Sequence, residues 1–280
     1  MIEIIRAGAL TTVQDLGRPG WAHLGVPRSG ALDIPALRRA NHLVGNPPGH
    51  AGLETTLTGC ALRLRSPGTL AVTGAQARVR VAGQTVDLGR PVAVPEGAVV
   101  DIGPARRGVR SYVAVNGGIA TDPVLGSRST DTLAGLGPVP LRDGDLVPLG
   151  PATPLPPTSE PVPPPPAPEV LELPVRLGPR DDWFTPAAIE TLLGTAYTIS
   201  MMSNRVGARL TGTPLPRART GELPSEGIVL GAVQVPADGQ PLVFLADHPT
   251  TGGYPVIAVV EEVAPLAQAR PGTTVRFRGS

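Results

Sequence analysis

The side chains of this chain that could do chemistry gather in four polar clusters set among glycines. The first lies near the N-terminus and contains Gln14, Asp15 and Arg18. Loops with this density of polar residues often carry function. The alternative is turn chemistry, in which Asp15 accepts hydrogen bonds from backbone amides while Gly17 and Gly20 supply positive φ. Composition favours neither interpretation over the other.

The second cluster is the segment GSRSTD, residues 126–131. Arg128 offers a planar fork of donors, and Ser127 adds a hydroxyl beside it. Such a loop could grip a carboxylate or a phosphate group. The alternative is that Arg128 and Asp131 pair with each other at the surface.

The third cluster is SNRVGARL, residues 203–210, where Arg205 and Arg209 lie four positions apart. Gly207 between them argues against a helix interior. Two arginines near one pocket would suit an anionic ligand, and structural ion pairs would explain them equally well.

The fourth cluster lies between residues 223 and 255. Gln234 and Gln240 flank a tight turn at Asp238-Gly239. The run Thr-Thr-Gly-Gly at 250–253 could present consecutive backbone N–H groups as an anion nest. The alternative is a loop between two strands that needs glycine for positive φ.

Several familiar mechanisms are excluded by residue type. All 24 basic residues are arginine, so the chain has no Schiff-base lysine, no Walker-type phosphate loop and no lysine for biotin. Cys60 is the single cysteine, which excludes an intrachain disulfide and a thiolate cage. The four histidines lack paired metal spacing, so we predict no metal site.

Composition is that of an ordinary soluble protein. Hydrophobic residues make up 41% of the 280 and charged residues 17%, with a net charge of +1. A net charge this small gives no strong positive electrostatic field to attract nucleic acid or an anionic membrane, so neither is expected as a partner. The N-terminus has no apolar leader and no run of 18 apolar residues occurs, which favours the cytoplasm.

The elements that must position these clusters divide into two β-rich parts. Residues 151–169 are over half proline, which suits an extended linker rather than a helix or central strand. We therefore predict one domain over residues 1–150 and a second over 170–280. The length of the chain is compatible with two ordinary domains.

Each part contains short strands and one helix. In the first, Asp33 can cap a helix that Gly45 ends. In the second, Thr185 can cap a helix whose buried stripe comprises Ala188, Ile189, Leu192 and Leu193, and Gly194 stops it. Strands are predicted, from β-prone runs between turn residues, at 2–7, 62–65, 69–74, 77–83, 111–118, 197–203, 228–235, 241–247, 256–262 and 274–279.

The same clusters resemble one known family over about the whole chain. The motifs that carry the resemblance are TTVQDLGRPG, HLGVPRSGALD, SYVAVNGGI, LGSRSTD, SNRVGARLTG, SEGIVLGAVQVPADGQP and TTGGYPVIAVV. They are similar to the KipA/PxpC family, the C-type subunit of 5-oxoprolinase, also called allophanate hydrolase subunit 2. That family is related to half of the carboxyltransferase region of urea carboxylase.

The resemblance implies a mainly β fold of two cyclophilin-like β-barrel domains. It implies two partners, the KipI-like B-type subunit of 5-oxoprolinase and its A-type subunit, which with this chain convert 5-oxoproline to glutamate using ATP. ATP with Mg²⁺ is then the expected cofactor. Two alternatives remain open: a biotin-dependent carboxyltransferase half, with biotin carried by another chain, and a regulator that only binds the KipI-like protein.

On this resemblance we assign site residues as hypotheses. The expected catalytic residues are Asp15, Arg128, Arg205 and Asp247. The expected substrate-binding residues are Gln14, Arg18, Ser127, Asn204, Gln234, Gln240, Thr250, Thr251, Gly252, Gly253 and Tyr254. Replacing Arg205 by alanine is expected to abolish ATP turnover in the complex and to leave folding intact.

Overall fold

The computed structural model describes residues 1–153, 170–219, 221 and 223–280. The chain forms two compact units. The first unit comprises Met1–Arg18, Ser29–Asp131 and Gly135–Ala167, and the second comprises Pro19–Arg28, Thr132–Ala134 and Pro168–Ser280. Most of the expected proline linker, residues 154–169, lies outside the described residues.

A curled, nine-stranded antiparallel sheet forms the described part of the first unit. Its strands are β1 (Ile2–Arg6), β2 (Thr11–Gln14), β3 (Gly52–Thr56), β4 (Cys60–Leu64), β5 (Gly68–Val81), β6 (Gln84–Val86), β7 (Val92–Val94), β8 (Val99–Val115) and β9 (Leu146–Val147). The main path runs β2-β3-β8-β4-β1-β9, and β5 pairs with β8 as well as with β6 and β7.

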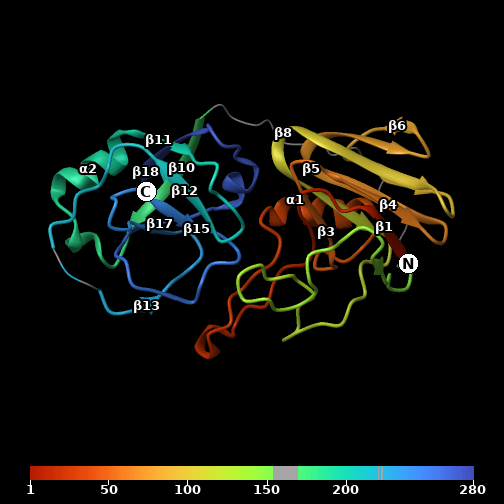
Figure 1. Ribbon diagram of the computed structural model, residues 1–280, viewed down its shortest axis with the longest axis horizontal. Coiled ribbons are helices and arrows are strands. Elements are labelled where there is room, and N and C mark those ends of the chain that lie inside the picture. Colours follow the sequence, from red (N-terminus) through yellow and green to blue (C-terminus); the bar gives the residue numbers. More distant parts are fainter. Residues whose placement is uncertain (154–169, 220, 222) are drawn as a thin grey trace. The chain divides into compact units, whose positions relative to one another are not determined.

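Strands β5 and β8 are the long spine of this sheet and run side by side (Figure 1). Their register shifts three times between Gly74 and Val79. Such bulges bend a strand and increase its twist, which lets the sheet curl. The prediction of separate strands at 69–74 and 77–83 is wrong, because both runs belong to β5.

Helix α1 (Ile34–Leu43) packs against β5 and β8. The predicted cap is confirmed, since the Asp33 side chain accepts a hydrogen bond from the Ala36 N–H at 2.9 Å. Gly45 follows the helix with φ 73°, a left-handed conformation that is unfavourable for most residues other than glycine. The buried face consists of Ala36, Leu37, Ala40, Asn41 and Leu43.

A buried hydrogen-bond network fixes the start of α1 to the sheet. The Tyr112 hydroxyl accepts from the Asp33 N–H (2.8 Å) and donates to Glu54 Oε2 (2.7 Å). Glu54 also accepts from the Leu32 N–H (3.1 Å) and faces Arg110 at 3.6 Å. Because burying a carboxylate is costly unless donors surround it, this network ties the helix to β3 and β8.

We predict that Tyr112→Phe lowers the free energy of unfolding by about 1–3 kcal/mol, because it leaves the Asp33 amide without its acceptor. Burial, reinforced by the Glu54 charge, raises the pKa of Tyr112 well above its usual value of 10.0. The phenol is therefore neutral in the folded state at neutral pH. The stability it contributes is complete below pH 10, the pKa in the unfolded chain, and is lost as pH rises towards the folded-state pKa.

Urea unfolding at pH 7 and at pH values above 10 checks both parts. Tyr254→Phe is the matched control, since that side chain is 47% exposed. Equal alkaline sensitivity of the Tyr112→Phe variant and the wild type would contradict the assignment.

The second unit holds a closed barrel in its described residues. The barrel order is β10-β17-β14-β15-β12-β11-β18. Its strands are β10 (Val170–Leu177), β11 (Ala196–Ile199), β12 (Gly207–Thr211), β14 (Ala232–Gln234), β15 (Leu242–Phe244), β17 (Val256–Val260) and β18 (Thr274–Gly279). A separate pair joins β13 (Glu226–Gly227) to β16 (Thr251–Gly252).

Helix α2 (Pro186–Gly194) begins as predicted, with the Thr185 side chain accepting from the Ala188 N–H at 3.1 Å. The predicted stripe is wrong at Leu193, which is 36% exposed. The strand expected at 228–235 is shorter, because only Ala232–Gln234 pairs in the barrel.

Three short 3₁₀ turns lie in the second unit: η1 (Ala22–Leu24), η2 (Asp181–Trp183) and η3 (Ala264–Gln268). The fold class expected from the sequence is confirmed: the chain is mainly β, with a curled half-barrel sheet in one unit, a closed barrel in the other and a short helix in each. None of the described helices is long and apolar enough to span a membrane.

Candidate functional site

In the first unit the polar residues of the sequence form one connected group, which we call the Asp15 cluster. It comprises Gln14, Asp15, Arg18, Ser29, Ser127, Arg128, Ser129, Thr130 and Asp131. Strand β2 ends at Gln14, so its end delivers Asp15 to the 127–131 loop.

The Asp15 carboxylate accepts four hydrogen bonds, three of them from that loop. Oδ1 accepts from the Gly17 N–H (2.8 Å) and from the hydroxyls of Ser127 and Ser129 (both 2.6 Å). Oδ2 accepts from the Arg128 N–H at 2.6 Å. The turn-chemistry interpretation is confirmed, and Gly17 has φ 83°. Asp15 therefore positions Arg128, and a catalytic role for Asp15 stays a prediction.

Arg18 is buried, with 1% of its surface exposed. Its Nη1 donates to the Ser29 hydroxyl (2.9 Å), and its Nε donates to the Val124 carbonyl (3.3 Å). Ser29 in turn donates to Asp131 Oδ2 at 2.7 Å. This arrangement places a guanidinium charge inside the unit and links it through Ser29 to a buried carboxylate.

Arg128 is the half-buried guanidinium of the cluster. Its Nε donates to the Thr121 carbonyl at 2.7 Å, and within the described chain its two terminal nitrogens have no hydrogen-bond partner. The expected surface pair with Asp131 does not form, because Asp131 is 2% exposed and accepts from Ser29. Burial, and next the Arg128 charge, lowers the pKa of His50. The Nε hydrogen bond therefore fixes the Arg128 guanidinium, and its two terminal nitrogens are available to bind a ligand.

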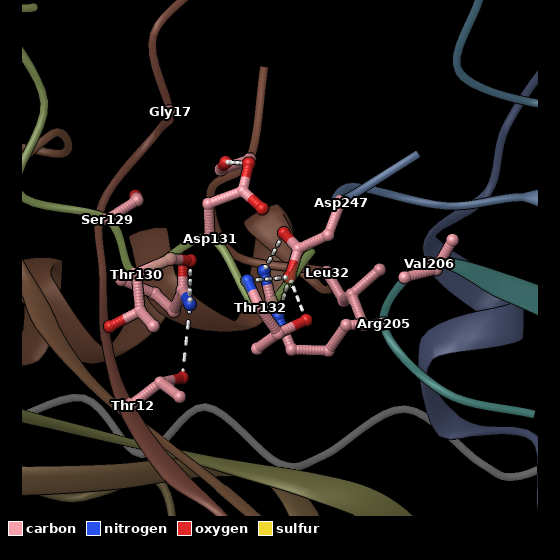
Figure 2. A network of polar contacts seen from close by, with 12 residues as sticks. Thr12, Gly17, Leu32, Ser129, Thr130, Asp131, Thr132, Arg205, Val206 and Asp247 are labelled. Carbon is pink, nitrogen blue, oxygen red and sulfur yellow. Dashed lines mark hydrogen bonds and ion pairs between the residues drawn. The ribbon is translucent and has the colours of Figure 1, made fainter. Parts of the chain in front are cut away.

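The Gln14 side chain is buried, and only its amide nitrogen has hydrogen-bond partners among the described residues. Its amide nitrogen donates to Thr12 Oγ1 and to the Thr130 carbonyl, both at 3.0 Å (Figure 2). Its amide oxygen and the Thr130 hydroxyl are buried without a partner in the described residues. Unsatisfied buried polar atoms are uncommon, so this corner has capacity for a further donor such as water.

In the second unit the central feature is the buried ion pair between Arg205 and Asp247, 2% and 0% exposed (Figure 2). Arg205 Nε and Nη2 each reach one carboxylate oxygen at 2.9 Å. Thr132 donates to Asp247 Oδ2 from its backbone N–H (3.0 Å) and its hydroxyl (2.6 Å). Of the two alternatives for this cluster, the structural ion pair holds for Arg205, whereas Arg209 on β12 is exposed.

This pair predicts a different outcome for Arg205→Ala from the intact folding expected above. Removing one partner of a buried ion pair costs about 3–5 kcal/mol. We expect Arg205→Ala and Asp247→Ala each to destabilise by that amount, and the double variant with both alanines to lose less than the sum of the two single changes.

Chemical unfolding of the single and double variants measures this coupling. Glu261→Ala is the control, because its partner Arg176 is 77% exposed and such pairs contribute about 0–1 kcal/mol. Additive single effects would show that the pair is not coupled.

Asn204, Gln234 and Gln240 support backbone turns. Asn204 Oδ1 accepts from the Val206 (2.8 Å) and Gly207 (3.2 Å) N–H groups. Gln234 Nε2 donates to the Tyr254 carbonyl at 2.9 Å. Gln240 exchanges two hydrogen bonds with the Gly212 backbone. These contacts position loops, and a substrate-binding role for the three amides stays a prediction.

The anion nest expected at 250–253 is wrong. Thr251 and Gly252 form β16, which pairs with Gly227 and Glu226. Neither Gly252 nor Gly253 has positive φ, so the conformational reason offered for these glycines is wrong as well. A Cβ at Gly252 would lie 2.8 Å from Gln234 Nε2, the far end of a flexible side chain that would have to shift. Thr250 and Tyr254 flank this strand, and Tyr254 is 47% exposed.

Sequence reasoning missed Ser29, Thr121 and Thr132. Thr132 directly follows the GSRSTD segment, so extending that motif by one residue would have found it. Ser29 has φ 53°, which no local pattern signals for serine. Among the described residues no three His, Cys, Asp or Glu side chains are grouped as metal ligands are.

These features can be compared with known proteins. The family described as carboxyltransferase domain, subdomain A and B, matches residues 24–279. The solved structures of K. lactis urea amidolyase and Kluyveromyces lactis urea carboxylase superpose with TM-scores of 0.93 and 0.90, each at 30% identity over 99% of this chain. The chain belongs to this carboxyltransferase domain family.

Two bacterial relatives are similar over nearly their whole length. The chain is 39% identical to the C-type subunit of 5-oxoprolinase from Escherichia coli and 33% identical to that from Haemophilus influenzae, covering 90% of each. The resemblance to the KipA/PxpC family is thereby confirmed. By contrast, the chain spans 18% and 27% of the two K. lactis chains and 16% of the Saccharomyces cerevisiae urea amidolyase, to which it is 33% identical.

Proposed function

We propose that this chain is one subunit of an ATP-dependent 5-oxoprolinase that opens 5-oxoproline to glutamate together with the A-type and B-type subunits. The observation that carries the proposal is its 39% identity to the C-type subunit of the Escherichia coli 5-oxoprolinase, over 99% of this chain and 90% of that one. Relatives that align end to end at this level share a domain arrangement, which partial matches do not establish.

The chemistry explains why such a reaction needs ATP. A five-membered lactam is a resonance-stabilised amide that water attacks slowly. Transfer of a phosphoryl group to the amide oxygen makes the carbon electrophilic and the oxygen a good leaving group. A site for this step needs fixed positive charge for the carboxylate or the phosphoryl group.

Within this chain Arg128 fits that need best. Its Nε and backbone N–H are fixed by the Thr121 carbonyl and Asp15, and its terminal nitrogens remain open. Arg18 and Arg205 are almost fully buried, and their donors are engaged inside their own units. We therefore assign Arg128 to the substrate anion, and Asp15 and Ser127 to positioning Arg128.

The described residues do not fit a Mg²⁺ site. Asp15 already accepts four hydrogen bonds, and Asp247 is shared between Arg205 and Thr132. A hard cation prefers carboxylate oxygens that are free of such donors. We propose that the partner subunits hold Mg²⁺ and ATP.

The decisive experiment measures glutamate formed from 5-oxoproline and ATP by the two partner subunits, with and without this chain. Activity that requires the chain supports the proposal. A correctly assembled complex that is inactive would reject it.

We expect Arg128→Gln to lower kcat/KM about ten- to hundredfold, because the substrate anion then loses its hydrogen bond to a positively charged side chain. Arg128→Lys should recover little, since lysine lacks the planar fork. Arg106→Gln is the control, because Arg106 is exposed. Unchanged kinetics of Arg128→Gln with normal complex assembly would remove Arg128 from the site.

A second candidate is half of a biotin-dependent carboxyltransferase. It is favoured by the TM-score of 0.93 to the K. lactis urea amidolyase structure. With no lysine, the chain would need carboxybiotin on another protein. Discharge of carboxybiotin by this chain with its partner, combined with no glutamate formation, would favour this second function.

A further inference from the structure

The second unit contains a surface pocket of about 540 Å³ that the sites above do not use. This volume falls within the range of small-molecule sites, about 300–1,000 Å³. Two segments wall it: residues 214–219 with Gly221, and the turn 236–239. Its lining residues are Pro214, Leu215, Pro216, Arg217, Arg219, Gly221, Pro236, Ala237, Asp238 and Gly239.

The two walls are joined firmly. The Leu215 N–H donates to the Gly239 carbonyl at 2.9 Å, and the Gly239 N–H donates to the Pro236 carbonyl at 3.1 Å. A Cβ at Gly239 would lie 3.0 Å from the Pro214 Cβ, so the walls meet closely at this point. Proline has no N–H, and therefore the lining offers few backbone donors.

The first wall provides a fixed positive group, Arg217. Its Nη2 donates to the Val235 carbonyl at 2.6 Å, and its guanidinium carbon lies 5.6 Å from the centre of the Tyr254 ring. Its Nε is buried and has no hydrogen-bond partner among the described residues. No carboxylate of the described residues pairs with Arg217, whereas the neighbouring Arg219 pairs with Asp182 at 2.6 Å.

The second wall provides a negative group, Asp238. Its Oδ1 accepts from the Gln240 N–H at 3.0 Å, which fixes the carboxylate on the turn. Its Oδ2 has no donor in the described residues. A simple anion would therefore be attracted by Arg217 and repelled by Asp238. A simple cation would be attracted by Asp238 and repelled by Arg217.

We propose that this pocket binds a small zwitterion of the amino-acid class, with its carboxylate at Arg217 and its ammonium group at Asp238. The apolar surfaces of Pro214, Pro216 and Ala237 suit a short side chain. The inference does not rest on the 5-oxoprolinase proposal, and a negative glutamate assay would leave it standing.

Isothermal titration of the full chain with glycine, L-alanine and L-glutamate tests the proposal, with acetate and methylamine as single-charge probes. We expect at least one amino acid to bind with Kd below about 10 mM, and both single-charge probes to bind at least about tenfold more weakly. Asp238→Asn and Arg217→Gln should each weaken amino-acid binding by about tenfold or more.

Asp238→Asn is the critical variant, because asparagine can still accept from the Gln240 N–H and so preserves the turn. Arg276→Gln, an exposed change on β18, is the control and should leave binding unchanged. Three results would overturn the proposal: no binding of any amino acid, acetate binding equal to glycine binding, or full binding by Asp238→Asn.

Discussion

Burying an ionised side chain is costly unless hydrogen bonds and opposite charge surround it, and this constraint shapes both units. Asp15 meets it with four donors, Asp247 with a bidentate guanidinium and a threonine, and Glu54 with a tyrosine, an amide and Arg110. Each buried carboxylate thus joins segments distant in the sequence. The loops that could meet a substrate are held in place by these carboxylates.

Much of the fold could be predicted from the sequence because its signals are local. Asp33 and Thr185 sit directly before apolar-periodic runs with proline in the first turn, so both helix starts were found. The single long strand β5 was missed, because Gly74 resembles a turn residue and only pairing with β8 shows that the chain continues through bulges. Leu193 was misplaced because helical periodicity alone does not say how wide the buried face is.

The sequence predicted which residues belong to the candidate site better than it predicted what each of them does. Arg205 and Asp247 were both named, yet their pairing depends on the antiparallel pairing of β12 with β15 and not on spacing along the chain. The glycines at 252–253 suggested a nest, and the structure places Gly252 in β16, paired with Glu226 of β13. Distinguishing a residue that binds a ligand from one that holds a loop requires knowing which donors are already engaged. That information is three-dimensional.

The placement of Thr132 has a consequence for how this sequence could be divided. Although Thr132 lies before residue 150, it belongs to the second unit and supplies two donors to Asp247. A gene split that separates residues 1–150 from 170–280 would remove both Thr132 donors from the buried Asp247 carboxylate. The two halves of the coding sequence are therefore constrained to remain together, however modular their sheets look.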